Sequence, residues 1–166
     1  WLTDRCMAGS DTLATARTLA MTLKTIGFDI ILCGRNSIDS ETGQVGPEIA
    51  ELLDIPHVSR ARKIELVDNS KCLRIERVTD HGYEVLECSL PALVTAAEGL
   101  SKERWPRRRE IEEAAERPIQ EVKAIDLSED LSPFGFEGSP TFVEEIRLVK
   151  SNRMGKTIEN PDPIKA

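Results

Sequence analysis

The chain has 166 residues, a formal net charge of −7 and 40% hydrophobic residues. This length and apolar content suffice for one domain with a buried core, and they exclude a disordered or fibrous protein. An acidic surface repels nucleic acid and anionic lipid, so we expect no nucleic-acid partner. No stretch approaches the roughly 18 apolar residues of a membrane span, so we also expect no membrane insertion.

The first predicted helix follows a cap formed by Ser10 or Asp11 and carries apolar residues at helical spacing as far as Ile26, where Gly27 ends it. A short buried strand is predicted over 28–33. A loop of glycines, hydroxyls and amides follows. Pro47 then stands at the first position of a second helix that ends before Pro56.

The periodicity changes to alternation in the next part of the chain. Segments 58–67 and 71–78 alternate and are separated by turn residues, and a further strand begins at Tyr83. They predict antiparallel hairpins. Pro91 marks a break before a last buried run at 92–96. Together with the two helices, these segments predict an α/β sandwich with a mixed sheet.

The remainder of the chain is highly charged. It contains a short, weakly amphipathic helix at 107–116 and a proline-containing tail with one alternating run at 142–149. A tail of this kind is expected to be an arm that lies on a neighbouring element or a partner chain. We therefore divide the chain into a core part, 1–100, and a charged helix with an extended C-terminal arm, 101–166.

The cysteines and histidines predict neither disulfides nor a metal site. The cysteines lie far apart and form no Cys-x-x-Cys pair: Cys6, Cys33, Cys72 and Cys88. This spacing favours a reducing compartment, the cytoplasm. The two histidines, His57 and His81, give no metal-ligand spacing with them.

The loop between the buried strand and the second helix has the composition of a nucleotide cradle. Open α/β sheets bind ligands where a strand's carboxyl end leads into a helix, and the free N–H groups there suit phosphate. Gly34, Gly43 and Gly46 would let the backbone approach a ligand, and Arg35 could pair with a phosphate. The residues alone leave open that the polar side chains only cap the helix and that the glycines only turn the chain.

Four stretches, in chain order, carry a family resemblance. They are "GSDTLATARTLA" (9–20), "ILCGRNSIDSETGQVGPEIAELLDIPHVS" (31–59), "IERVTDHGYEVLECSLPALVTA" (75–96) and "LSKERWPRRREI" (100–111). Together they resemble the β subunit of electron transfer flavoproteins. His81 departs from the small or acidic residue usual in the third stretch, and Arg108 stands where the family usually has a leucine that anchors dehydrogenases.

The resemblance implies a Rossmann-like, adenine-nucleotide-binding three-layer sandwich that pairs with an α subunit as a heterodimer. Such a pair holds FAD, with AMP in some members, and carries electrons from dehydrogenases or NADH to an acceptor such as a quinone reductase. The subunit is an electron carrier without catalytic residues of its own. Family members have further strands and helices at the amino terminus, so we expect residues 1–100 to be the C-terminal part of the nucleotide-binding domain.

Carried over by position, the resemblance places the nucleotide on the loop that ends at the second helix. The implied cofactor-binding residues are Gly34, Arg35, Asn36, Ser37, Asp39, Thr42, Gly43, Gln44 and Val45. AMP-binding members often have a hydroxyl residue at the position of Val45. Its absence favours the electron-bifurcating or nitrogen-fixation-linked branch, in which the cradle holds the adenine end of a second FAD.

Two other functions remain open at this point. A non-redox, adenine-nucleotide-binding regulatory module would keep the cradle without needing an α subunit. An adenylating enzyme of the same fold is a third possibility, although the chain has no phosphate-binding motif with a lysine. Asp11 and Thr12 could either contact the nucleotide or only cap the first helix.

Overall fold

The computed structural model describes residues 1–67, 69, 71–147 and 155. The elements in chain order are η1 (Arg5–Met7), α1 (Thr12–Ile26), β1 (Ile30–Cys33), α2 (Val45–Leu53), β2 (His57–Val67), β3 (Cys72–Thr79), β4 (Gly82–Ser89), β5 (Ala92–Ala96), α3 (Arg108–Ala115) and α4 (Ala124–Leu127).

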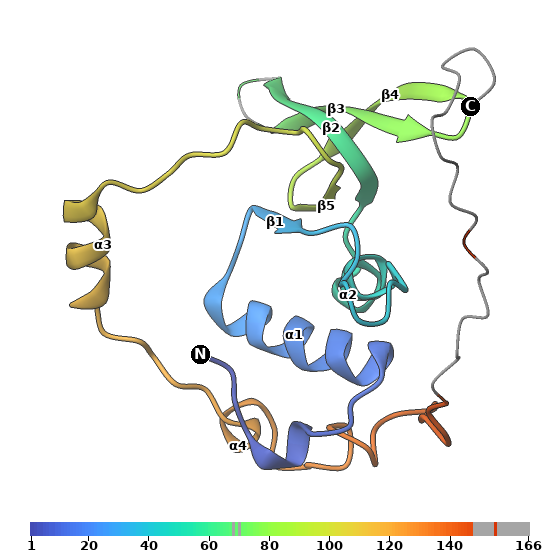
Figure 1. Ribbon diagram of the computed structural model, residues 1–166, viewed down its shortest axis with the longest axis vertical. Coiled ribbons are helices and arrows are strands. Elements are labelled where there is room, and N and C mark those ends of the chain that lie inside the picture. The colour runs from blue at the N-terminus through green and yellow to red at the C-terminus, as the bar shows by residue number, and fades with distance from the viewer. Residues whose placement is uncertain (68, 70, 148–154, 156–166) are drawn as a thin grey trace.

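The five strands form one mixed sheet in the order β1-β5-β2-β3-β4 (Figure 1). Strand β5 lies between β1 and β2 and runs parallel to both, whereas β2, β3 and β4 form an antiparallel meander. The predicted hairpins and the α/β fold with a mixed sheet are thereby confirmed.

Helix α1 begins and ends as its sequence predicts. The N–H of Ala14 donates to Asp11 Oδ1 at 2.9 Å, which caps the helix, and Gly27 ends it with a φ of +76°. The buried residues of α1 are short: Ala14, Ala16, Thr18 and Ala20. Small side chains let α1 pack closely against its neighbours, of which α2 is the nearest helix.

The core has one cluster on each face of the sheet. The cluster beneath α1 and α2 contains Ala16, Ala20, Ile31, Ile49, Ala50 and Leu93. The second cluster is built from strand residues: Val58, Ala61, Leu73, Ile75, Ala92 and Val94. Alternate residues of β5 contribute to the two clusters, so both clusters depend on this interior strand.

Two element boundaries differ from the sequence prediction by two residues, and the boundaries of β2, β3 and β4 differ by one. Strand β1 begins at Ile30 rather than at Phe28. The Phe28 side chain packs against the core cluster beneath α1 and α2, which is called the helix-side cluster below. Helix α2 begins at Val45 rather than at Pro47. A proline is tolerated throughout the first helical turn, because the N–H groups there have no intrahelical partner, so Pro47 marks this turn without fixing its first residue.

The chain after β5 returns to the amino-terminal segment. Helix α3, predicted within 107–116, has no buried residue and stands apart from the sheet and from α1 (Figure 1). Further along, the N–H of Ala124 donates to Asp4 Oδ2 at 3.2 Å, and the Phe134 side chain is buried. The alternating run at 142–149 forms no strand over 142–147, and residues 148 and 149 lie outside the described part of the chain.

Residues 133–141 of the arm are attached to α1 near its start. Asp11 Oδ2 accepts hydrogen bonds from the N–H and the hydroxyl of Thr141, at 3.0 and 2.8 Å. Arg17 Nη1 donates to the carbonyl oxygens of Pro133 and Gly138. The arm therefore lies on its own chain over residues 133–141, and Asp11 both caps α1 and holds the arm.

Candidate functional site

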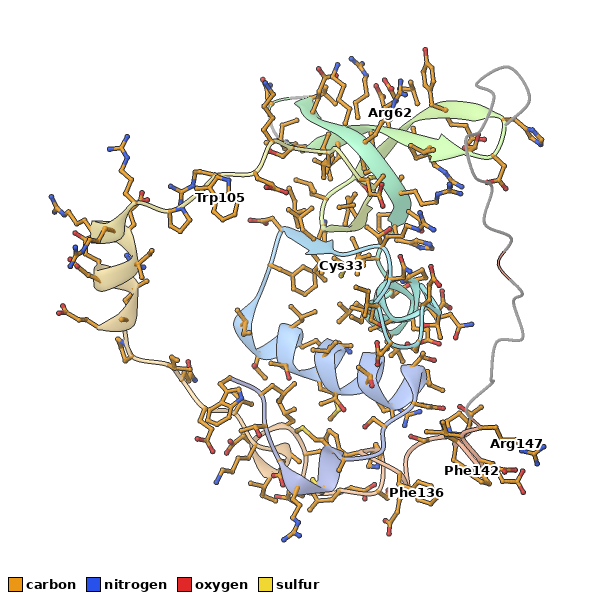
Figure 2. The ribbon with its side chains drawn as sticks, viewed as in Figure 1. Cys33, Arg62, Trp105, Phe136, Phe142 and Arg147 are labelled. Atoms are coloured by element: carbon orange, nitrogen blue, oxygen red, sulfur yellow. The ribbon has the colours of Figure 1, made fainter. Side chains whose placement is uncertain are left out.

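The loop 34–44 lies at the carboxyl end of β1, beside the end of β5. Cys33, the last residue of β1, lies close to α2 (Figure 2) and pairs with Thr95 of β5. The loop leads directly into the amino terminus of α2. Two parallel strand ends and a helix start therefore meet here, which is the arrangement in which α/β sheets bind ligands.

A tight turn inside the loop holds its polar side chains. The N–H of Glu41 donates to the carbonyl oxygen of Ser37 at 3.1 Å, and the Ser37 and Ser40 hydroxyls lie 3.1 Å apart. Hydrogen bonds from the Ser37 hydroxyl and from the backbone N–H groups of Asp39 and Ser40 lower the pKa of the Asp39 carboxyl below its ordinary value. Asp39 is therefore a carboxylate at neutral pH.

Most N–H groups of the loop are available to a ligand. Among the described residues, Glu41 is the only position from Arg35 to Gly46 whose N–H donates to a backbone carbonyl. The N–H groups of Val45 and Gly46, in the first turn of α2, have no helical partner. A row of unpaired N–H groups at a helix start favours an anionic group such as a phosphate.

Two adjoining hollows border the loop. The first, about 470 Å³, lies between the loop and the chain that leaves β5, and it is lined by Arg35, Asn36, Ser37, Ile38, Glu41, Ala96, Ala97 and Glu98. The second, about 410 Å³, lies between the loop and the meander, and it is lined by Arg35, Asn36, Glu41, Thr42, Gly43, Ser59, Arg60, Asp80 and Thr95. Because they share Arg35, Asn36 and Glu41, a ligand with several groups could occupy both.

The structure divides the residues predicted to bind the cofactor into two groups. Those that line the hollows are Arg35, Asn36, Ser37, Thr42 and Gly43. Those that line neither hollow are Gly34, Asp39, Gln44 and Val45.

The second group lies at the two ends of the loop and at its outer turn. Gln44 is turned toward α1, where its Oε1 accepts from the Thr12 hydroxyl at 3.3 Å. Val45 packs against the helix-side core cluster. A Cβ built on Gly34 meets no atom within 4 Å, so this glycine leaves room beside the loop.

Gly46 serves packing rather than access for a ligand. A Cβ at this position would lie 2.8 Å from Thr95 Cγ2. Non-bonded carbon atoms do not approach so closely without displacement. Gly46 therefore allows the start of α2 to lie directly against β5, which fixes where the loop ends.

The sequence reasoning missed the wall that faces the loop in the second hollow. Ser59 and Arg60 come from β2, Asp80 from the turn between β3 and β4, and Thr95 from β5. These residues are distant from the loop in sequence, and only the position of β5 between β1 and β2 brings them to it. Had the parallel pairing of β5 with β1 been predicted, it would have placed Thr95 beside the loop. Nothing in the local sequence indicates that Arg60 lies there.

Clusters of metal-binding side chains, long apolar helices and cysteines are the other features of the described residues that could indicate a site. No cluster of three or more histidine, cysteine, aspartate or glutamate side chains is placed to hold a metal ion. No helix within 1–67 and 71–147 combines the length and apolar character needed to cross a membrane. All four cysteines are free thiols, and burial raises the pKa of Cys33.

Comparison with known proteins identifies similar sequences. The family model described as "Electron transfer flavoprotein domain" matches residues 1–127. The chain is 40% identical, over 93% of its length, to "Electron transfer flavoprotein subunit beta" of Thermoanaerobacterium thermosaccharolyticum and 38% identical, over 96%, to that of Clostridium acetobutylicum. It is 38% identical, over 87%, to "Protein FixA" of Bradyrhizobium diazoefficiens. It spans 59%, 61% and 53% of the lengths of these three relatives.

Proposed function

Since the chain belongs to the electron transfer flavoprotein family, we propose that the protein acts as a β subunit that binds an adenine nucleotide on loop 34–44 and passes electrons together with an α subunit. The observation that carries this proposal is the loop itself. It places unpaired backbone N–H groups and amide and hydroxyl side chains at the junction of β1, β5 and α2.

The donors around the loop suit the phosphate and ribose of AMP or of FAD. The backbone N–H groups of the loop residues that line the hollows and the Arg35 guanidinium would hold phosphate oxygens. Asn36 and Thr42, which line the second hollow, offer an amide and a hydroxyl to the ribose. When a flavin is bound, its isoalloxazine supplies the redox chemistry, and the residues described here only bind and orient the nucleotide end.

Between the two possible nucleotides, we favour the adenine end of a second FAD. Val45 offers no hydroxyl where AMP-binding members often have one, and it packs into the core instead of facing the hollows. The likeness to proteins named FixA favours the same branch. In this branch NADH would be the electron donor, and the protein would work in the cytoplasm, where its four cysteines stay reduced.

Analysis of the ligands released from the complete heterodimer tests this function. The full-length protein is co-expressed with its α subunit, purified and denatured, and the released nucleotides are quantified by mass spectrometry. We expect two FAD per heterodimer and no AMP. One FAD with one AMP would retain the electron transfer function but overturn the choice of branch.

Two other outcomes would overturn the function itself. A complex that releases no adenine nucleotide would show that the loop is not a cradle. A protein that retains AMP but neither flavin nor an α subunit would be a non-redox regulatory module.

A further inference from the structure

Strand β2 contains a bulge beside the second hollow. Val58 pairs with Val94 and Ala61 with Ala96, so β2 has one more residue than β5 between these two pairs. Arg60 lies in this bulge with a φ of +61°, a conformation that is unfavourable for residues with a Cβ. Bulges of this kind redirect a side chain, and they are frequent beside binding sites.

The backbone of Arg60 is held by a buried partner. Its N–H donates to Thr95 Oγ1 at 3.0 Å, and the Thr95 side chain is only 3% exposed. The same threonine contacts Gly46 at the start of α2. The base of the Arg60 side chain is therefore fixed relative to the helix that ends the loop.

The guanidinium of Arg60, by contrast, is weakly held. Among the described residues, it donates from Nη1 to Asp80 Oδ1 at 3.3 Å, which is a long single hydrogen bond. The side chains of Arg60 and Asp80 are 36% and 86% exposed. Ion pairs this exposed contribute little to stability, so an incoming anion can replace Asp80 at small cost.

We propose that Arg60 is a phosphate ligand of this cradle and that Asp80 occupies its guanidinium until a nucleotide binds. The inference rests on the proposed function, because it assigns a phosphate group to the second hollow. Arg60 lies across this hollow from the loop residue Arg35. Two arginines that line one hollow can each form paired N–H···O bonds with a phosphate.

The charges in the hollow are consistent with this exchange. Arg35 and Arg60 are balanced there by Glu41 and Asp80. When the phosphate arrives, Asp80 loses its partner but remains hydrated, because it is almost fully exposed. The bound phosphate then has two cations within reach, and the displaced carboxylate carries only a small desolvation penalty.

The alternative is that Arg60 and Asp80 form only a structural link between β2 and the β3–β4 turn. Two variants separate these roles. Arg60→Gly removes the guanidinium and relieves the left-handed backbone, since glycine adopts a φ of +61° without strain. Asp80→Asn breaks the same ion pair but leaves the guanidinium in place.

The test measures the binding of AMP and of adenosine to the full-length heterodimer, freed of nucleotide, by titration calorimetry. We expect Arg60→Gly to weaken AMP binding about tenfold or more and to change adenosine binding less than about twofold. Asp80→Asn should bind AMP as well as the parent or more tightly. Arg60→Lys, which keeps the charge but loses the planar fork, should fall between the parent and Arg60→Gly, and it serves if the glycine variant does not fold.

Several results would overturn the inference alone. They are equal AMP affinity in the parent and Arg60→Gly, equal losses for Arg60→Gly and Asp80→Asn, equal losses of AMP and adenosine binding, and a parent that binds AMP no more tightly than adenosine. A parent that binds neither compound would instead refute the proposed cradle, and this inference with it.

Discussion

Replacing Gly46 with alanine tests the contact that fixes the start of α2 against the sheet. The added Cβ would lie 2.8 Å from Thr95 Cγ2 and 3.6 Å from Leu93 Cδ2. Thr95 belongs to the interior strand β5 and is 3% exposed, so it has little space into which it can move. The most direct relief is a shift of α2 away from β5, which would carry the end of the loop with it.

Two opposing effects set the magnitude. Overpacking of a well-packed core destabilises a protein by about 1–3 kcal/mol. Alanine is favoured over glycine in a helix interior by about 1 kcal/mol, and less than that in the first turn, where Gly46 lies. We therefore expect a net loss of about 1 kcal/mol, which lowers the melting temperature of a chain of this size by roughly 2–4 °C.

The assay compares the unfolding of the full-length parent, Gly46→Ala, Thr95→Ser and the double variant. Thr95→Ser removes the methyl group that alanine would strike and keeps the hydroxyl, so the double variant should be more stable than the sum of the two single losses predicts. Gly34→Ala is the matched control, because its Cβ meets nothing within 4 Å and it should change stability by less than about 0.5 kcal/mol. If Gly46→Ala matches the parent and shows no coupling to Thr95→Ser, α2 does not lie on β5 as described.

Two further substitutions and one pH change test the arm and the cradle. Asp11→Ala removes the cap of α1 and the attachment of the arm, so it should lower the free energy of unfolding by about 1 kcal/mol and speed limited proteolysis within 128–147. Asp11→Asn is the control that keeps the cap. An unchanged cleavage rate for Asp11→Ala would contradict the attachment of the arm. Partial burial raises the pKa of Asp11, but hydrogen bonds from Ala14 and from the arm lower it more, so the folded value lies below the ordinary one. Its stabilisation is therefore complete above the ordinary pKa of about 3.9 and is lost as the pH falls through the folded value, a loss that the unfolding of Asp11→Ala should not show. The double variant Asn36→Ala with Thr42→Ala should lose one of the two FAD expected per heterodimer, measured by mass spectrometry of the purified complex, whereas Thr25→Ala, at the far end of α1, should retain both.

The parts of the fold that the sequence predicts are those controlled by neighbours in the chain. Asp11 and Gly27 bound α1 because a cap and a left-handed stop act within one helical turn. The hairpins follow from alternation and from turn residues between the strands. The loop could be recognised as a candidate site for the same reason, because its glycines and polar residues lie in one continuous stretch.

The features that the sequence does not predict depend on contacts between distant segments. Alternation predicts that 92–96 is a buried strand, but not that it inserts between β1 and β2. The local sequence does not predict the bulge at Arg60, because arginine is not a residue that favours a positive φ. The contact of Ala124 with Asp4 joins residues 120 positions apart in the chain, and no periodicity in the sequence indicates it. The sequence therefore shows one wall of the candidate site, while the opposite wall requires the folded sheet.

Thr95 contacts both walls of the candidate site, its methyl group on one side and its hydroxyl on the other. The Cγ2 methyl packs against Gly46 at the start of α2, whereas the hydroxyl accepts from the N–H of Arg60. Thr95→Val keeps a methyl group against α2 and removes the acceptor, which leaves the partly buried N–H of Arg60 unpaired at a cost of up to about 1–3 kcal/mol. Thr95→Ser keeps the hydroxyl that accepts from Arg60 and removes the methyl group that packs against α2. If the bulge positions Arg60 for a phosphate, Thr95→Val should weaken AMP binding more than Thr95→Ser does, with both measured by calorimetry on the heterodimer. Equal AMP affinities for the two variants would mean that the hydrogen bond to Arg60 stabilises the sheet without shaping the site.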